Sequence, residues 1–320
     1  MIPDITEKSA YAVNKVVIGA TKADGGTREC TIEIGGEATW PFLRNDGDIG
    51  NRPRVAVDVL DVVPDDWPEM LLEPWRDVVD NPAAWARRAV EFGAELICVR
   101  LQGVHPDRGD FGAEHAVETV SKIKEAVGVP LIVWRCEDDI KDNEIMPVVS
   151  EALRGERALL GSVVEKNYKR LTGVCLADGH NLVCEAPIDV NIAKQMNILV
   201  TEMGVPQDRI VMYQTSGALG YGIEYAYSIQ QRQREAALKG DAMMAMPVIA
   251  HAGCEAWRTK EARVSEAENP AWGSQPPRAI MWEAMTAQGM LLSGADIVTM
   301  RHPQAIDMVK NNILRLFSVD

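Results

Sequence analysis

Polar side chains stand at the ends of eight short apolar runs in this chain of 320 residues. They supply carboxylates, guanidinium groups, hydroxyls, amides and imidazoles, and in chain order they are Asp58, Asp61, Arg100, Gln102, Arg135, Glu137, Ser162, Glu185, Gln214, Thr215, Ser216, His251, Glu255, Arg301 and His302. No GxSxG motif and no cysteine with a matched histidine is present, so no nucleophile has a recognisable base. We therefore expect no catalytic residue on this chain.

Two short clusters have the residue types of a metal site, namely His251, Cys254 and Glu255, and His105, Asp107 and His115. Neither cluster matches a familiar ligand spacing. The six cysteines contain no CxxC pair, which argues against an iron–sulfur cluster, a structural zinc or a disulfide framework; they are Cys30, Cys98, Cys136, Cys175, Cys184 and Cys254. We expect no metal on the chain and a reducing compartment.

A glycine-rich loop, residues 215–222, follows the sixth apolar run. Backbone N–H groups in such a strand-to-helix loop can meet an anion, or lie close to a flat ligand, because glycine carries no Cβ. The alternative is that these glycines only make the turn.

The elements that position these residues alternate regularly along the chain. Strands are predicted at 54–62, 95–101, 130–136, 158–164, 181–187, 209–215, 246–253 and 295–301, each followed by a helix. Near-continuous apolar strands indicate a parallel sheet covered by helices. Eight such units predict an α/β fold, a (β/α)8 TIM barrel. A doubly wound sheet is the alternative, but the glycines of GALGYG at 217–222 lack the dinucleotide-binding spacing.

The first 53 residues form an extension ahead of the barrel. Residues 15–22 and 30–36 read as two strands of a β-hairpin joined by a glycine-containing turn. The predicted organisation is an N-terminal hairpin extension, 1–53, and a TIM barrel, 54–320, that together make one structural domain.

Two connections after predicted strands are long, residues 62–81 and 254–277. Loops at this end of a barrel carry binding and catalysis. They hold half of the chain's eight tryptophans, namely Trp67, Trp75, Trp257 and Trp272. Exposed tryptophans on one face are typical of a partner interface. The alternative is that each ring packs its own loop onto the barrel.

Composition excludes several classes of protein. The chain has 33 basic and 47 acidic side chains, a net charge of −14 and a pI near 4.9, which argues against nucleic-acid binding. Its longest uncharged run, residues 210–223, contains three glycines and is too short to span a bilayer. Residues 1–10 show no secretory signal, so a cytoplasmic location is expected.

Several segments together resemble a known family. They are VVIGATKADGGTRECTIEIGG at 16–36, NRP at 51–53, APIDVNIAKQMNIL at 186–199, GALGYGIEYAYSI at 217–229, EAWRTKEA at 255–262, PAWG at 270–273 and MRHP at 300–303. In this order and spacing, from about residue 11 to 317, the chain resembles the small subunit of the corrinoid iron–sulfur protein. The same family is called the delta subunit of the acetyl-CoA decarbonylase/synthase complex.

The resemblance implies a TIM barrel related to pterin-dependent methyltransferases. It implies a heterodimer with a large subunit that carries a [4Fe–4S] cluster, its own barrel and a cobamide-binding domain. Such a heterodimer carries a methyl group from a methyltetrahydrofolate or tetrahydropterin methyltransferase to acetyl-CoA synthase/CO dehydrogenase, in the reductive acetyl-CoA pathway of carbon fixation. The cofactor supplies the chemistry and the protein supplies position and environment.

In the family the corrinoid (cobalamin-type) cofactor lies between the partner and the top of the small barrel. We therefore expect its contacts from the glycine-rich loop and the last strand, namely Gln214, Thr215, Ser216, Gly217, Leu219, Gly220, Tyr221 and Arg301. The cluster is expected on the partner, and the four loop tryptophans at the partner interface.

The chain departs from the family pattern at two positions. Members end the sixth strand on Asp-Pro, where this chain has Tyr213 and Gln214, and carry a tyrosine before EAWR, where this chain has Cys254. Methyltransferase barrels use an acidic residue there on the pterin. Two functions remain open: a non-catalytic subunit that caps the corrinoid, and a stand-alone methyltransferase acting on a methylated pterin or another donor.

Overall fold

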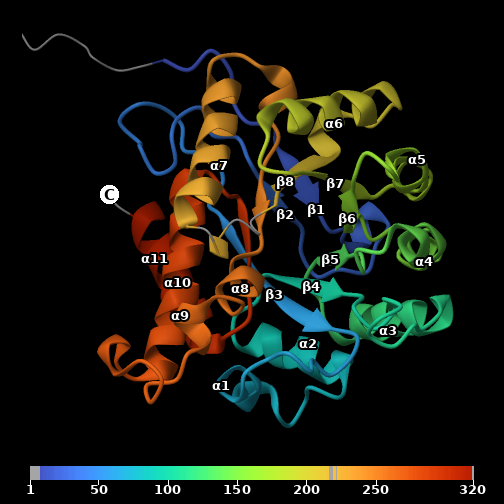
Figure 1. Ribbon diagram of the computed structural model, residues 1–320. Helices are drawn as coiled ribbons and strands as arrows, with labels where there is room; N and C mark the ends of the chain where they lie inside the picture. Colours follow the sequence, from blue (N-terminus) through green and yellow to red (C-terminus); the bar gives the residue numbers. More distant parts are fainter. Residues whose placement is uncertain (1–7, 216–218, 221, 319–320) are drawn as a thin grey trace, which may run out of the picture.

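Eight parallel strands form a barrel in the computed structural model, which describes residues 8–215, 219–220 and 222–318 (Figure 1). The strands are β3 (Arg54–Leu60), β4 (Leu96–Arg100), β5 (Leu131–Trp134), β6 (Leu159–Val163), β7 (Asn181–Ala186), β8 (Ile210–Gln214), β9 (Ile249–Ala250) and β10 (Ile297–Met300). Their order is β8-β7-β6-β5-β4-β3-β10-β9, and a parallel bridge between Met212 and Val248 joins β8 to β9. The predicted TIM barrel is confirmed.

Helices follow the strands and surround the barrel. The longer ones are α2 (Pro82–Glu91), α3 (Ala113–Ala126), α4 (Asp139–Ala152), α5 (Tyr168–Asp178), α6 (Val190–Glu202), α7 (Ile223–Leu238), α10 (Gln275–Ser293) and α11 (Pro303–Phe317). Local sequence sets several of their ends. The side chains of Asn81, Asp138 and Asp189 accept hydrogen bonds from backbone N–H groups in the first turns of α2, α4 and α6.

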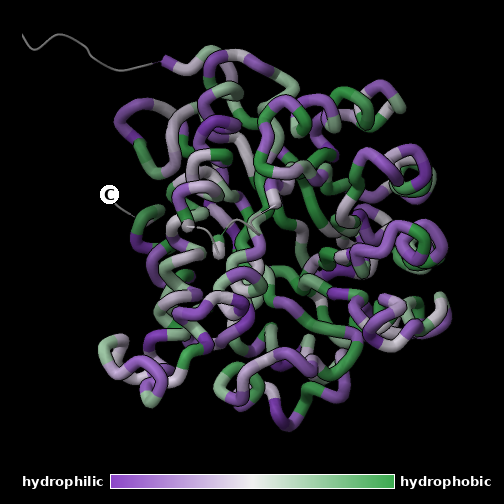
Figure 2. The backbone as a smooth tube through the Cα atoms, in the orientation of Figure 1, coloured by the Kyte–Doolittle hydropathy of each residue, from purple (hydrophilic) through white to green (hydrophobic). Residues whose placement is uncertain are grey.

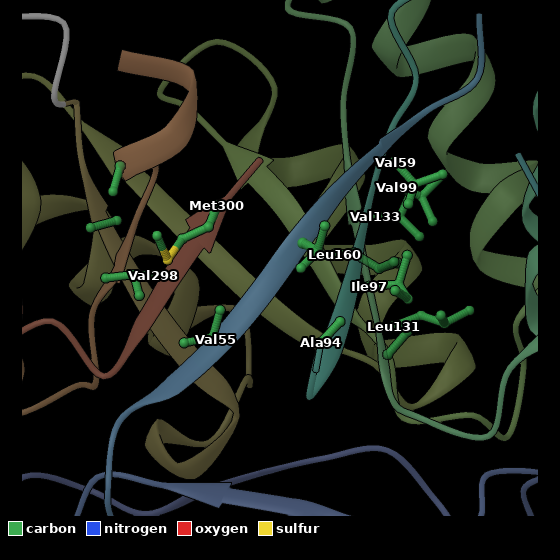
Figure 3. Packing of buried hydrophobic residues seen from close by; sticks show 14 of the residues in the cluster. Val55, Val59, Ala94, Ile97, Val99, Leu131, Val133, Leu160, Val298 and Met300 are labelled. Atoms are coloured by element: carbon green, nitrogen blue, oxygen red, sulfur yellow. The ribbon is translucent and has the colours of Figure 1, made fainter. Parts of the chain in front are cut away.

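Side chains alternate between the two faces of each strand, as a period of two requires. Val55, Val57 and Val59 of β3 pack outward against the helices, together with side chains such as Val99 and Val133 of the next strands (Figure 3). Figure 2 shows the hydrophobic residues concentrated along the strands. The same alternation turns Ala56 and Asp58 of β3 into the barrel.

The N-terminal hairpin covers the amino-terminal end of the barrel. Strands β1 (Val16–Ile18) and β2 (Ile32–Ile34) pair antiparallel, and their buried isoleucines and valine join the barrel's inner core. The Asn181 amide, at the start of β7, donates to the Val17 carbonyl at 2.8 Å. The hairpin thus plugs one end of the barrel and leaves the carboxyl ends of the strands as the accessible mouth.

Both long connections lie at this mouth. The first contains the short helix α1 (Glu69–Leu72), and the second contains α8 (Ala252–Ala256) and α9 (Lys260–Arg263). Within the described residues, no helix is long and apolar enough to cross a membrane.

Candidate functional site

A buried charge cluster lies inside the barrel mouth. Strand alternation turns Asp58, Arg100 and Arg301 inward, and each is at most 4% exposed. Asp58 Oδ2 lies 2.9 Å from the Nε of Arg100 and 2.9 Å from the Nε of Arg301. Burial acts to raise the pKa of Asp58, but the two guanidinium groups outweigh it and lower that pKa to about 2. Asp58 is therefore a fixed anion that orients two cations.

Three rings fill the barrel axis beside this cluster, and we call Trp134, Tyr213 and His251 the ring layer. The ring centroids of Trp134 and His251 are 4.1 Å apart, those of Tyr213 and His251 are 4.7 Å apart, and those of Trp134 and Tyr213 are 5.2 Å apart. His251 Nδ1 lies 2.9 Å from Thr299 Oγ1. Burial, aided by Arg100, holds the pKa of His251 well below its usual value, so the imidazole is neutral.

Arg135 is anchored by three partners at the end of β5. Its Nε donates to Ser162 Oγ at 2.9 Å, its Nη1 to Asp142 Oδ2 at 2.8 Å, and its Nη2 to Glu185 Oε2 at 3.3 Å. These partners come from β6, α4 and β7. A guanidinium group held on this many sides has a fixed orientation.

A pocket of about 380 Å³ opens at the mouth over β4, β5 and α8, and we call it the mouth pocket. It is lined by Arg100, Gln102, His105, Asp107, Arg108, Arg135, Cys136, Glu137, Cys254 and Arg258. Burial raises the pKa of the Cys136 thiol to about 12, and that side chain is not a thiolate at neutral pH. The walls offer hydrogen-bond donors and charged groups, together with the thiols of Cys136 and Cys254.

Glu283 of α10 ties the last strand to the second long loop. Its Oε1 accepts from the Arg301 backbone N–H at 2.5 Å, and its Oε2 accepts from Trp257 Nε1 at 2.7 Å and from the His302 N–H at 3.1 Å. Burial raises the pKa of Glu283 to about 7 against these donors. This contact holds Arg301 and the α8 segment in register.

The expected corrinoid contacts divide into three groups. Ser216, Gly217 and Tyr221 lie outside the described residues. Gln214, Leu219 and Arg301 are buried, whereas Thr215 is half-buried and Gly220 is exposed. A Cβ added to Gly220 would meet nothing within 4 Å, so packing within the chain does not demand glycine there. Gly220 and Thr215 are thus the described members of this set with exposed surface at the rim.

The loop tryptophans differ from the expected exposed set. Trp67, Trp75 and Trp257 are 7%, 0% and 1% exposed, so the expectation of exposed rings is wrong for these three. Trp67 and Trp75 pack against Trp85, and Trp75 Nε1 donates to the Arg301 carbonyl at 3.1 Å. They pack their loops onto the barrel, which was the alternative. Trp272 is 39% exposed, and its place at a partner interface stays a prediction.

Several exposed apolar side chains lie on one flank of the barrel, where α7 and α10 pack side by side (Figure 1). Its members are Ile223, Tyr227, Met281, Met285 and Leu292, each at least 36% exposed, and we call them the α7–α10 face. Ile223 packs over Gly289, because a Cβ there would lie 2.8 Å from Ile223 Cδ1. The spacing of 281, 285 and 292 along one helix face is a signal that sequence reading missed.

Other mouth residues escaped sequence reasoning because no local signal marks them. Arg108 and Arg258 reach the pocket from loops after β4 and β9. Neither cluster weighed as a metal site assembles: within the described residues, no group of three or more His, Cys, Asp or Glu side chains is placed to hold a metal ion.

Comparison with known proteins identifies relatives along most of the chain. The sequence profile described as CO dehydrogenase/acetyl-CoA synthase delta subunit matches residues 15–310. The acetyl-CoA decarbonylase/synthase complex subunit delta of Archaeoglobus fulgidus is 36% identical over 308 residues, covering 93% of this chain and 67% of the relative. The subunit delta of Methanopyrus kandleri is 38% identical over 300 residues, covering 93% and 73%.

Solved structures with the same fold include dihydropteroate synthases. The enzyme from Xanthomonas albilineans in complex with 7,8-dihydropteroate has a TM-score of 0.57 at 13% identity, covering 84% of this chain and 95% of that one. The enzyme from Thermus thermophilus has a TM-score of 0.54 at 16% identity, covering 88% and 99%. At this identity the likeness describes the barrel alone.

Proposed function

Because the chain belongs to the CO dehydrogenase/acetyl-CoA synthase delta subunit family, we propose that it is the small subunit of a heterodimeric methyl carrier. Its partner is a large subunit that holds a corrinoid and a [4Fe–4S] cluster. The barrel mouth covers the corrinoid while a methyl group passes from a methyltetrahydrofolate or tetrahydropterin methyltransferase to acetyl-CoA synthase. The chain itself is non-catalytic in this scheme, and its location is cytoplasmic.

The observation that carries this choice is the end of β8, where Tyr213 and Gln214 stand in place of the acidic residue that methyltransferase barrels use on the pterin. Trp134, Tyr213 and His251 pack ring against ring along the barrel axis, and the space beneath the mouth centre is filled with side chains. A methyltransferase of this fold would hold a pterin in the mouth. A packed axis is common to barrels of this fold, so the missing acidic residue is what supports a covering role over the stand-alone methyltransferase.

The mouth suits one face of a corrinoid. Pockets for drug-sized ligands measure about 300–1,000 Å³. The mouth pocket, at about 380 Å³, is too small to enclose a corrin macrocycle with its side chains, so this chain would contact one side and a partner the other. When bound, the corrinoid supplies the cobalt that accepts and releases the methyl group. Arg258 and Gly220 are exposed at the rim. The Arg258 guanidinium can donate hydrogen bonds to peripheral amides of the corrinoid. Gly220 leaves space for the macrocycle because it has no Cβ.

The α7–α10 face is the surface that we assign to the large subunit. Its five exposed side chains come from two helices that pack against each other, whereas scattered single exposed apolar residues need no explanation. Met side chains adapt to a partner's shape. Ile223 is the first residue of α7, and along the chain it follows β8, whose carboxyl end lies at the mouth. One partner can therefore reach both surfaces.

Co-purification tests the proposed function. The tagged chain, co-expressed with the corrinoid-bearing large subunit from the same source, is expected to yield an equimolar complex with cobamide and iron–sulfur absorption bands. Methyl transfer by the isolated chain from a methylated pterin to free corrinoid, without any complex, would contradict the proposal and establish the stand-alone methyltransferase.

Two variants separate the surfaces. Met285→Glu, in the α7–α10 face, is expected to weaken the complex, whereas Ile140→Glu, at a residue 79% exposed on α4, serves as the control. Gly220→Val is expected to slow methyl transfer in an intact complex, since its Cβ meets nothing within the chain. Equal complex formation by both Glu variants would reject the assigned face.

A further inference from the structure

We propose that the mouth pocket binds a small molecule through a carboxylate or phosphate group, and that this chain holds that ligand without a partner. The site goes beyond the covering role, because it needs neither the corrinoid nor the large subunit. It rests on the placement of charge in the pocket walls.

The buried charge in these walls is positive. Arg100 and Arg135 are 4% and 7% exposed, and both line the pocket. The two carboxylates of the lining, Asp107 and Glu137, are exposed at the rim, where water screens them. Among the lining side chains, a ligand in the pocket therefore meets two desolvated guanidinium groups at the wall and carboxylates at the edge, although Asp142 and Glu185 already neutralise Arg135 from behind.

The two buried guanidinium groups differ in how many of their N–H donors have an acceptor. Arg135 is satisfied by Ser162, Asp142 and Glu185. Arg100 pairs with Asp58, which it shares with Arg301, and the buried carboxyl group of Glu255 is the further acidic group near both cations. Arg100 Nη2 is buried and has no hydrogen-bond partner within the described residues. A buried donor without a partner is costly, and an anionic acceptor would relieve that cost.

Two further guanidinium groups flank the opening. The Arg258 side chain is 53% exposed and its Nη1 lies 3.6 Å from Glu255 Oε1, a loose pair. Burial raises the pKa of Glu255 above its usual value. Arg108 Nη1 donates to Gln102 Oε1 at 2.6 Å, which holds it at the rim. The side chains of Arg258 and Arg108 can both turn toward an anion by rotamer changes, without a change in the backbone.

The volume sets the size of the ligand. About 380 Å³ is near the lower end of the range for small-molecule sites, and the lining is polar rather than aromatic. This favours a compact anion over a nucleotide or a flat aromatic ring. Inorganic phosphate and succinate are suitable probes of the two head groups, and succinamide is the neutral match to succinate.

Calorimetric titration of the full chain tests the site. We expect saturable binding of phosphate, succinate or both, and no binding of succinamide. Binding of phosphate would indicate a phosphate ligand, and binding of succinate would indicate a carboxylate ligand. Arg258→Gln and Arg108→Gln should each lower the affinity for the anion about tenfold, because each variant loses one charge-assisted hydrogen bond to it. Glu137→Gln should raise it by removing the rim carboxylate. Arg87→Gln, an exposed arginine on α2, is the control.

Thiol footprinting gives a second readout. Cys254 lines the pocket, whereas Cys30 is exposed on the N-terminal extension. Bound anion should slow alkylation of Cys254 by iodoacetamide and leave Cys30 unchanged. No saturable binding, equal binding of succinamide, or wild-type affinity in both pocket arginine variants would overturn the site. Because the chain is tested without its partner, such failure leaves the co-purification result untouched.

Discussion

Asp58 shows at the residue scale how the mouth is kept rigid. It is fully buried between Arg100 and Arg301, and both guanidinium groups approach the same carboxylate oxygen. Removing one partner of a buried ion pair leaves an uncompensated charge in a poorly solvated place. Replacing Asp58 is therefore expected to lower the free energy of unfolding by more than the intact cluster contributes to it.

Asp58→Asn is expected to destabilise the fold by about 3–5 kcal/mol, because two buried cations lose their counter-charge. Urea unfolding measures the change. Asp65→Asn, at an exposed position in the next loop, removes the same charge and should have little effect. Equal unfolding midpoints for the two variants would show that the cluster is not stabilised by Asp58.

Glu283 gives a pH dependence whose sign follows from its burial. Its folded pKa is raised from 4.5 to about 7, so the folded state holds its proton more tightly than the unfolded state. The associated stability is fully present below pH 4.5 and is lost as pH rises to about 7, amounting to about 3 kcal/mol. Glu283→Gln should flatten this slope, whereas Glu266→Gln, at an exposed site, should retain it. Unfolding free energy measured from pH 4.5 to 7.5 decides between these outcomes.

At the element scale, the second long loop is held by one buried ring and ends in an exposed one. Trp257 is 1% exposed and donates to Glu283, whereas Trp272 is 39% exposed and lies over the Arg278 guanidinium, 5.5 Å from ring centroid to Cζ. The first ring fixes the loop on the barrel. The second ring leaves part of its surface exposed.

Trp257→Ala should destabilise the fold by about 3–5 kcal/mol, as the loss of a buried tryptophan does. Trp272→Ala should change stability by less than about 0.5 kcal/mol, yet weaken partner binding by about 2 kcal/mol if the ring is an interface anchor. Thermal unfolding and a pull-down with the large subunit measure the two effects separately. Unchanged partner binding would reduce Trp272 to an ordinary surface residue.

The whole molecule is organised around a barrel closed at one end. The hairpin shares the inner core with all eight strands, through Ile18, Ile32 and their neighbours. The extension also carries Glu37, whose buried carboxylate lies 2.9 Å from Arg234 Nη1 of α7. Extension and barrel are therefore expected to unfold together.

Ile18→Ala should lower the unfolding free energy by about 2–5 kcal/mol, because the residue is fully buried between hairpin and barrel. Tryptophan fluorescence and circular dichroism should report the same shifted midpoint. Ile192→Ala, at a position 40% exposed on α6, is the control. A fluorescence transition of the barrel unaffected by Ile18→Ala would mean that the hairpin folds apart from it.

Much of this architecture follows from patterns within short stretches of chain. Eight apolar runs separated by helical segments indicate the barrel, since parallel strands buried on both faces must be apolar throughout. The polar residues that end those runs include Asp58, Arg100, Arg135 and Arg301, which do lie at the mouth. The family follows from segments spread along the whole chain. Each of these conclusions depends on local spacing or on order, which a linear sequence contains.

Contacts between segments distant in the sequence were decided only by the tertiary structure. The ring layer joins Trp134, Tyr213 and His251 from β5, β8 and the end of β9, and its formation depends on strand phase and register. The loop tryptophans are buried because their loops fold back over the barrel, which composition does not reveal. The mouth pocket needs Arg258 from a loop more than a hundred residues beyond Arg135. Side chains meet according to where the backbone returns, and that is a property of the closed barrel rather than of any single segment.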